Sequence, residues 1–426
     1  MDKDKLKRII LDQKDVFNSK KHLMYRDINL EKYISTKQIV VITGIRRCGK
    51  SSLLSLIKQK MNLDESEYCY FNFDDERINT DVSILEEIYS IHLETYGREP
   101  ILFLDEIQNI DVWEKFVNRM YEQGTKLFVT GSNATLLSSE ISSSLTGRKK
   151  LIELFPFSFT EFLQFIGNQY NIHQLSTKSK SFIIKDFDRY FEKGGFPLVV
   201  EENDIELINS YFQDILYRDI IARYRLTQVD ELKQIGLFFA ANTGKLFSYS
   251  TLQKISGVKS TSSIKNYLYY YSQSYLFFYL KKFDYSLKKQ MMNPKKVYTI
   301  DPGIASRIGF NFSENKGRIL ENIVFLELLR RKKDVFYYSG KKECDFVIKE
   351  GLNIVETIQV SHKIDQSNEQ REYQGLLEAM SMFNLKQGLL LSYDTEKTIN
   401  SGSDTIIVMP VWKWLCLSGY SSSARR

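Results

Sequence analysis

The sequence predicts an α/β fold built on a parallel β-sheet, followed by a helical region and a smaller α/β domain. Three observations support this prediction. Short apolar runs alternate with segments long enough for crossover helices between residues 38 and 155. A glycine-rich loop joins the first apolar run to an amphipathic segment. After about residue 230, a helix-turn-helix pattern and a hairpin precede a second mixture of helices and strands.

Five apolar runs are the expected strands of the first sheet. They are residues 38–43, 68–73, 101–106, 126–131 and 150–155. Helices are expected at 52–61 and 112–123, and residues 1–37 show a helical alternation of charged and apolar positions. Because the strands are short, apolar and widely spaced, we expect helices to cover both faces of the sheet.

The composition is typical of a reduced, cytoplasmic globular protein. The chain has 426 residues, of which 43% are hydrophobic and 26% are charged. Its net charge of +6 permits nucleic-acid binding without requiring it. The four cysteines are far apart and form no CxxC pair, which argues against a disulfide framework or a zinc site. No apolar run approaches the roughly 20 residues of a membrane span, so we expect no membrane partner.

The changes of pattern along the chain predict five parts. They are an ATPase-like core with a helical extension (1–160), a helical lid or linker (161–228), a winged-helix-like domain (229–303), a nuclease-like α/β domain (304–416) and a disordered tail (417–426). In the third part, a short helix, a turn at Gly257 and a longer helix precede two strands with a lysine-rich loop between them. This order is the outline of a winged helix.

The loop GIRRCGKSS matches the pattern G-x-x-x-x-G-K-[ST] and lies between a predicted strand and a predicted helix. Two glycines allow the backbone N–H groups to face phosphates, and the helix N-terminus adds positive potential. Lys50 is expected to reach the β- and γ-phosphates of ATP, and Ser51 to ligate Mg²⁺. The alternative is a glycine-rich turn capped by serine. The predicted binding residues are Gly44, Ile45, Arg46, Arg47, Cys48, Gly49, Lys50, Ser51 and Ser52.

Hydrolysis also needs acidic residues, and ILFLDEIQ supplies two at the end of a predicted buried strand. Asp105 is expected to hold the hydrated Mg²⁺, and Glu106 to polarise the attacking water. On its own, such a pair is more often an acidic helix N-terminus. The phosphate-binding loop upstream favours the catalytic interpretation.

Three further residues are candidates for the same site. Ser132 and Asn133 follow the fourth predicted strand, where a polar side chain senses the γ-phosphate or caps the strand end. Arg148, in LTGRKK, is a candidate arginine finger that acts within its own chain or on a neighbouring copy. The alternative for Arg148 is an ordinary solvated surface position. A finger acting between copies would imply a homo-oligomer.

The order of these motifs resembles the AAA+ superfamily, and more narrowly the prokaryotic AAA ATPases with a C-terminal domain called DUF4143. The resemblance covers about residues 20–415 and is carried by GIRRCGKSS, FLDEIQN, VTGSNA with LTGR, and EKGGFPLVV with DILYRDI. It implies a P-loop sheet in which the strand before Ser132 lies between the P-loop strand and the Asp105 strand. It also implies ATP binding and hydrolysis, with Arg148 matching the family's conserved GR pair.

The winged-helix outline suggests double-stranded DNA as a partner, with a reading helix at about 261–273 and the hairpin as the wing. The hairpin lysines would favour phosphate contact. They are Lys281, Lys282, Lys288, Lys289, Lys295 and Lys296. The alternatives are interdomain packing and simple solubility, because the expected reading helix is rich in tyrosine and has no arginine.

The C-terminal region resembles the PD-(D/E)XK nuclease fold, in which two carboxylates bind Mg²⁺ and a lysine steadies the attacking water. Glu321 lies on a predicted helix, and Glu343 and Asp345 on a predicted strand. The position of the (D/E)-x-K triplet reads Gln359-Val360-Ser361, so a carboxylate and a lysine are missing. Lys363 would substitute for the lysine if the strand continued. We expect a structural domain, with an impaired nuclease as the alternative.

The sequence therefore predicts Mg²⁺-dependent ATP binding and hydrolysis coupled to a conformational change. The output would be an action on nucleic acid or on a protein partner. Two alternatives come from other classes of protein. One is an ATP-gated nuclease, and the other is a low-turnover nucleotide switch or DNA-binding scaffold.

Overall fold

A computed structural model of the chain describes residues 2–20, 23–78, 80–134, 147–309, 316–364 and 369–419. It contains two compact units. The first comprises Met1–Phe155 with Gln273–Tyr275, and the second comprises Pro156–Ser272 with Leu276–Arg426. The sequence-based division into five parts stays a prediction. Residues 420–426 of its expected tail lie outside the described residues, and residues 417–419, also predicted to be disordered, instead end a helix over Val411–Gly419.

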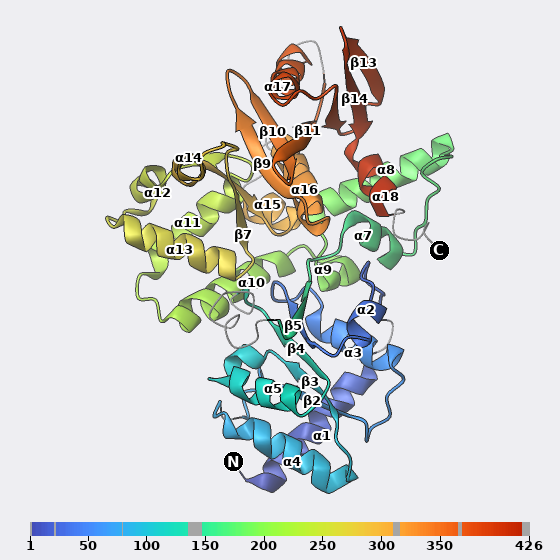
Figure 1. Cartoon of the computed structure of the whole chain (residues 1–426), viewed down its shortest axis with the longest axis vertical. Helices are drawn as coiled ribbons and strands as arrows, with labels where there is room; N and C mark the ends of the chain where they lie inside the picture. The colour runs from blue at the N-terminus through green and yellow to red at the C-terminus, as the bar shows by residue number, and fades with distance from the viewer. Residues whose placement is uncertain are drawn as a thin grey trace. The chain divides into compact units, whose positions relative to one another are not determined.

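The first unit contains a parallel five-stranded sheet (Figure 1). Its strands are β1 (Ile39–Thr43), β2 (Tyr68–Asn72), β3 (Ile101–Asp105), β4 (Leu127–Gly131) and β5 (Lys149–Glu153). Their order is β2-β3-β4-β1-β5, so β4 lies between β1 and β3. The five strands were predicted from the sequence, and the place of β4 between β1 and β3 was implied by the family resemblance; both predictions are confirmed.

Helices surround this sheet because its strands carry apolar side chains on both faces. The helices are α1 (Lys3–Ser19), α2 (Glu31–Ile34), α3 (Lys50–Lys60), α4 (Ser83–Tyr96), the short 3-10 helix η1 (Ile107–Asn109) and α5 (Trp113–Glu122). Side chains of α4 and α5 pack in one core with alternate strand residues such as Val41, Leu104 and Val129. The intervening Phe103 and Phe128 stack on each other with centroids 5.0 Å apart. This two-sided burial fixes the sheet on which the candidate site is built.

The second unit begins with helices and a small antiparallel sheet. The helices are α7 (Phe159–Phe165), α8 (Thr177–Lys193), α9 (Pro197–Glu202), α10 (Leu207–Asp214), the π-helical segment η3 (Ile215–Ala222), α11 (Val229–Ala241), α12 (Tyr249–Ser256), α13 (Thr261–Gln273) and α14 (Leu287–Met292). The strands are β6 (Leu246–Phe247), β7 (Phe277–Leu280) and β8 (Lys295–Thr299), in the order β6-β8-β7. The predicted helix-turn-helix and hairpin are present, whereas β6 and α14 were not predicted.

The motif EKGGFP lies at the end of α8 and has a packing reason for its two glycines. Gly194 has φ +74°, and a Cβ on it would lie 1.7 Å from Oδ1 of Asp301. Gly195 N–H donates to Oδ2 of Asp301 at 2.7 Å, and Gly303 N–H donates to Oδ1 at 2.9 Å. Burial raises the pKa of Asp301 to about 7. The glycines therefore let the backbone approach a buried carboxyl group.

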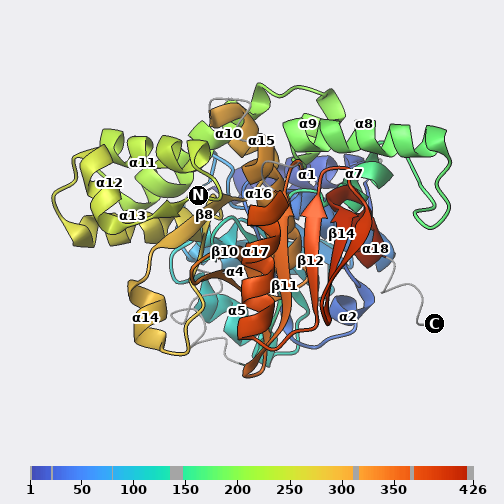
Figure 2. The same cartoon turned by 90° about the horizontal axis from the view of Figure 1, so that it is seen from above.

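A mixed six-stranded sheet completes the second unit (Figure 2). Its strands are β9 (Asp334–Ser339), β10 (Glu343–Glu350), β11 (Asn353–Ser361), β12 (Gln387–Ser392), β13 (Lys397–Ser401) and β14 (Asp404–Pro410). The helices of this part of the chain are α15 (Pro302–Ile308), α16 (Lys316–Arg330), α17 (Glu369–Met382) and α18 (Val411–Gly419). The strand order is β13-β14-β12-β11-β10-β9. Helix α17 contacts β10, β11 and β12. The helix predicted to carry Glu321 and the strand predicted to carry Glu343 and Asp345 are present as α16 and β10, whereas the hairpin β13-β14 and α18 were not predicted.

Among the described residues, none of the helices is both long enough and apolar enough to span a lipid bilayer.

Candidate nucleotide site

The loop between β1 and α3 has a backbone that only glycine accepts readily at its two ends. Gly44 has φ +152° and Gly49 has φ +102°. A Cβ on Gly44 would lie 2.1 Å from the carbonyl oxygen of Leu154. Arg47, between the two glycines, also has a positive φ of 71°. The loop therefore turns tightly onto the N-terminus of α3, as a phosphate-binding loop does.

Lys50 is the first residue of α3, and only 4% of it is exposed. Its Nζ lies 3.2 Å from Oε1 of Glu106 and donates to the carbonyl oxygens of Gly44 and Ile45 at 3.2 and 3.3 Å. Burial alone would lower the pKa of Lys50, but the nearby charges, with Glu106 first, outweigh it and raise the pKa. The ammonium is therefore charged and points back along the loop.

Asp105 ends β3 and is fully buried. Its Oδ2 accepts a hydrogen bond from the Tyr70 hydroxyl at 3.0 Å, and its Oδ1 accepts one from Thr130 Oγ1. Burial and the charge of Glu106 raise the pKa of Asp105, although a hydrogen bond with the Ser51 side chain opposes that shift. Ser51 and Asp105 therefore lie together, and their oxygens are the ligand type that Mg²⁺ prefers.

Glu106 follows Asp105 with a left-handed backbone, φ +55°. Its Oε1 faces Lys50, while its Oε2 accepts hydrogen bonds from Gln108 Nε2 at 2.6 Å and from Ser132 N–H at 3.2 Å. Burial would raise the pKa of Glu106, but the charge of Lys50 and the hydrogen bond from Gln108 outweigh it and lower the pKa to about 2. A non-glycine residue in this conformation stores strain, as active-site residues often do.

The predicted sensor residues lie at the same edge of the sheet. Ser132 and Asn133 follow β4 and are 0% and 2% exposed. The Ser132 backbone reaches the carboxylate of Glu106, so the structure brings these two predicted residues together. Thr130 also belongs to this group, because its Oγ1 accepts a hydrogen bond from Glu106 N–H at 2.9 Å.

Three residues of this group were not singled out from the sequence: Tyr70, Gln108 and Thr130. Tyr70 and Thr130 lie inside strands, where a polar side chain gives no local sign of its partner. Gln108 stands two residues after Glu106, and that proximity was the one signal that was available. This closeness in sequence predicts that Gln108 lies near Glu106, but it does not predict the hydrogen bond between them.

Arg148 lies at the opposite edge of the sheet from the loop. It immediately precedes β5, whose first residue pairs with Ile39, while the loop follows Thr43 at the other end of β1. Five strand residues at about 3.3 Å each separate the two edges by roughly 16 Å. Arg148 Nη1 donates to Asn118 Oδ1 at 2.6 Å and to Glu122 Oε1 at 2.9 Å. Within its own chain Arg148 therefore lies away from the loop, which contradicts a finger acting in the same chain. A finger acting on a neighbouring copy and an ordinary surface position both stay open, and the bonds to Asn118 and Glu122 fit the second.

In the second unit, Lys296 on β8 lies among the three acidic residues that were predicted as a nuclease-like site. Its Nζ lies 2.9 Å from Glu321 Oε1, 2.7 Å from Glu343 Oε1 and 2.8 Å from Asp345 Oδ1. Lys296 is only 2% exposed. Burial would lower its pKa, but the carboxylates, with Asp345 first, hold it well above its usual range. Lys296 was predicted to contact DNA phosphate, and that prediction is wrong because the side chain is buried among acids.

We call Glu321, Glu343 and Asp345 the acid cluster. Gln359 is hydrogen-bonded to a member of this cluster. Its Oε1 accepts a hydrogen bond from Asp345 N–H at 3.2 Å, and its Nε2 donates to Glu372 Oε2 at 2.8 Å. Strand β11 ends at Ser361, so the condition under which Lys363 would replace the missing lysine is not met, and Lys363 is an exposed residue after the strand. Within the described ranges, no group of three or more His, Cys, Asp or Glu side chains is arranged to hold a metal.

The acid cluster should make stability depend on pH through Glu321. Burial and the charge of Asp345 raise its pKa to about 7, while Lys296 and Tyr298 oppose the shift. The folded state therefore binds the proton of Glu321 more tightly than the unfolded state does. Protonation of Glu321 contributes to stability at low pH, and this contribution is lost as pH rises from about 4.5 through about 7. Between pH 5 and pH 8, we expect wild type to lose about 1–3 kcal/mol relative to Glu321→Gln. Thermal unfolding of both proteins across this range checks it, and parallel curves would contradict it.

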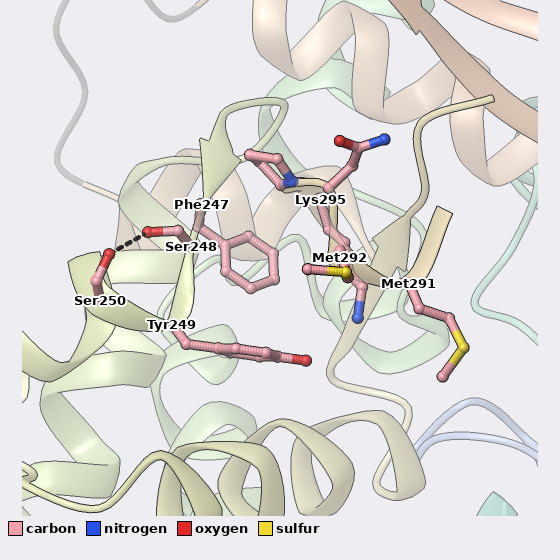
Figure 3. A pocket seen from close by; sticks show the side chains of 9 residues that line it. Phe247, Ser248, Tyr249, Ser250, Met291, Met292 and Lys295 are labelled. Atoms are coloured by element: carbon pink, nitrogen blue, oxygen red, sulfur yellow. Dashed lines mark hydrogen bonds between the residues drawn. The ribbon is translucent and has the colours of Figure 1, made fainter. Parts of the chain in front are cut away.

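Residues 229–303, for which a winged helix was predicted, offer a mixed surface at the hairpin of β7 and β8. A pocket of about 250 Å³ lies between the start of α12 and the end of α14 (Figure 3). Its lining includes Phe247, Tyr249, Met291, Met292 and Lys295. The buried side of α13 is apolar, with Ile264 and Tyr271 fully buried. The surface combines lysines with exposed apolar side chains, which suits contact with either nucleic acid or protein.

Comparisons with known families identify two segments of the chain. Residues 36–163 match a family described as AAA domain, and residues 184–315 match a domain of unknown function, DUF8612. The first match agrees with the sheet order and the loop, and it confirms the predicted P-loop α/β fold. The sequence resemblance implied a DUF4143-type domain, whereas the family that matches the region after the ATPase core is DUF8612.

Two curated relatives match nearly the whole chain. The uncharacterized protein MJ1544 of Methanocaldococcus jannaschii is 37% identical over 429 residues, covering 95% of this chain and 94% of that protein. An uncharacterized protein of Haemophilus influenzae is 30% identical over 407 residues, covering 91% of this chain and 98% of that protein.

Solved structures show a more distant likeness. The Thermotoga maritima RuvB Holliday junction branch migration motor is 14% identical, with a TM-score of 0.31, and the match covers 60% of this chain and 89% of that chain. The Aeropyrum pernix ORC1 protein in complex with DNA is 11% identical, with a TM-score of 0.33. The match covers 73% of this chain and 94% of that chain. TM-scores this low support no argument about this chain.

Proposed function

We propose that this chain, which belongs to the same family as the uncharacterized protein MJ1544 and carries an AAA domain, binds ATP with Mg²⁺ and hydrolyses it. The observation that carries this proposal is the meeting of Lys50, Asp105 and Glu106 at the carboxyl edge of one parallel sheet. In open α/β sheets, ligands bind outside the carboxyl ends of the strands. The three side chains also combine the charges that phosphoryl transfer to water requires.

The residues present fit a nucleotide with its metal ion. The glycine turn and the N-terminus of α3 suit a triphosphate, because a Cβ at Gly44 would fill the turn. Ser51 and Asp105 would hold Mg²⁺, which neutralises phosphate charge when bound. Glu106 is ionised at neutral pH because its pKa is lowered, so its carboxylate can accept a proton from water.

Lys50 has to change partners when phosphate binds. Its ammonium now faces Glu106 Oε1 and the carbonyl oxygens of Gly44 and Ile45, so its three N–H donors are in use and a β/γ-phosphate can be bound only if one of these contacts is released. Moving Lys50 to phosphate would leave Glu106 held only through its other oxygen, by Gln108 and Ser132. Glu106 Oε1 would therefore become available to accept a proton only when ATP is bound.

We propose nucleic acid or a protein partner as the target of the resulting conformational change. Of the six hairpin lysines, Lys281, Lys288 and Lys289 are exposed, and Lys282 and Lys295 are half-buried. These five support phosphate contact through the winged-helix-like region. A homo-oligomer in which Arg148, at the amino edge of the sheet, reaches the site of a neighbouring copy is the form of the finger role that this position leaves open.

A nuclease function is not proposed for the C-terminal domain. Glu321 and Asp345 lie together, but the ammonium of Lys296 stands between them. Asp345 Oδ2 accepts a hydrogen bond from Val360 N–H at 3.0 Å, so the carboxylate is bound to protein at both oxygens. Structural packing accounts for these contacts without cleavage chemistry.

The Lys50→Ala variant tests the proposed function. We expect Mg²⁺-dependent ATP hydrolysis by wild type, and a loss of turnover and of nucleotide affinity by about 100-fold in the variant, because a charge that contacts phosphate is removed. Phosphate release and the binding of a fluorescent ATP analogue measure these effects.

Lys60→Ala is the matched control for Lys50→Ala. Lys60 is on the same helix, and its surface ion pair with Glu31 is worth little. The control should behave as wild type. Equal turnover in Lys50→Ala and wild type would overturn the proposal, and tight ATP binding without turnover in wild type would favour the nucleotide-switch alternative.

A further inference from the structure

Gln108 makes a contact with Glu106 that fixes the orientation of its amide. It lies on η1, and its Nε2 is 2.6 Å from Glu106 Oε2 and 3.4 Å from Ser132 Oγ. Only the amino group of the amide can donate to a carboxylate. The amide carbonyl, Oε1, must therefore point the other way.

The Gln108 carbonyl oxygen is buried and has no hydrogen-bond partner in the part of the chain that the structure describes. Leaving such an acceptor unsatisfied is unfavourable, because the oxygen has given up its hydrogen bonds to water and gained none in return. Most buried polar atoms have a partner, so an acceptor of this kind beside an ionised acid calls for an explanation. A donor that arrives with the substrate would supply one.

Glu106 needs a second support once Lys50 turns to phosphate. Its Oε2 is held by Gln108 and by the Ser132 backbone, while its Oε1 is held by Lys50. Oε1 is therefore the oxygen that becomes available to accept a proton. The amide of Gln108 extends from the same carboxylate and presents its own acceptor nearby.

We infer that Gln108 is a positioning residue for the hydrolytic step: its Nε2 orients Glu106, and its Oε1 accepts a hydrogen bond from the attacking water. This inference rests on the proposed ATPase function. In the step, the water oxygen bonds to the terminal phosphorus, and one water proton passes to Glu106. The bond from that phosphorus to the bridging oxygen breaks, and its electron pair leaves with ADP. The second hydrogen stays on the water oxygen, where it is hydrogen-bonded to Gln108 Oε1, and it leaves as part of the released phosphate.

The Gln108→Leu variant tests this role because leucine has a similar size without the amide. We expect kcat to fall about 10- to 100-fold, while KM and the dissociation constant for Mg-ATP change by about twofold or less. A purely structural role for Gln108 would lower nucleotide binding and thermal stability together with kcat, whereas the inferred role lowers kcat and leaves the other two unchanged.

Gln123→Leu, at the end of α5, is the matched control and should retain wild-type kcat. If Gln108→Leu does not fold, Gln108→Asn keeps the amide but shortens its reach, and it should show the same loss of kcat. Turnover that depends on Lys50 but is unchanged in Gln108→Leu and Gln108→Asn overturns this inference and leaves the proposed function standing. Wild type without Lys50-dependent turnover overturns both.

Discussion

Replacing Glu106 with glutamine is expected to lower kcat for ATP hydrolysis by about 100- to 1000-fold. The change keeps the size of the side chain and removes the carboxylate that accepts the proton. Binding of Mg-ATP should be retained or slightly tightened, because one negative charge near the phosphates is lost. Steady-state phosphate release and equilibrium binding of a fluorescent ATP analogue measure the two effects separately.

The split between turnover and binding is what makes this change informative. Lys50→Ala should damage both, whereas Glu106→Gln should spare binding, since Glu106 is not expected to hold the nucleotide. Glu76→Gln, an exposed change in the same unit, is the control. A Glu106→Gln protein that hydrolyses ATP at the wild-type rate would show that another group accepts the proton, and Asp105 would be the next residue to change.

The nucleotide site was largely predictable because its determinants are local. The loop residues are contiguous, and Asp105 and Glu106 end a short apolar run whose place after the loop predicts a buried strand. Parallel strands bring their carboxyl ends to one edge, so the loop, the two acids and Ser132 were expected to meet before the fold was known. The helix-turn-helix and the hairpin that follows it in the second unit were predictable for the same reason, since they rest on periodicity within short segments.

The contacts that were missed are those between distant segments. Thr130 lies 25 residues from Asp105 in sequence and Tyr70 lies 35 residues from it, and neither position is polar for a reason visible in its own strand. Lys296 is the clearest case. In a run of lysines it looks like a solvated residue, yet its partners are 25 and 49 residues further along the chain. Neighbouring residues in sequence do not reveal which lysine of a run turns inward.

Strand β8 gives the physical reason for that inward turn. Lys295 and Lys296 are consecutive in the strand, so their side chains point to opposite faces of the small sheet. Lys295 lines the surface pocket, whereas Lys296 reaches the acid cluster beneath the other face. The alternation of a strand therefore assigns one lysine to solvent and one to the interior. That assignment needs the register of β8, which the sequence did not supply.

Replacing Lys296 with methionine is expected to destabilise the second unit by about 3–5 kcal/mol, the usual cost of removing one partner from a buried ion pair. Methionine keeps the length of the side chain, so the loss is mainly of charge. Glu321 and Asp345, at most 8% exposed, would then face each other without an ammonium. Chemical and thermal denaturation measure the loss, with Lys288→Met on the exposed α14 as the control.

Removing the acids together with the lysine separates charge from packing. In Lys296→Met combined with Glu321→Gln and Asp345→Asn, no buried charge is left unpaired, and most of the lost stability should return. If the single Lys296→Met variant is as stable as wild type at pH 7, the acids must take up protons in place of the ammonium. Its stability should then fall as pH rises above 7, because Glu321 already has its pKa raised to about 7 and would lose its strongest source of positive charge. A variant that is stable and independent of pH would show that the Lys296 ion pairs contribute nothing to the fold.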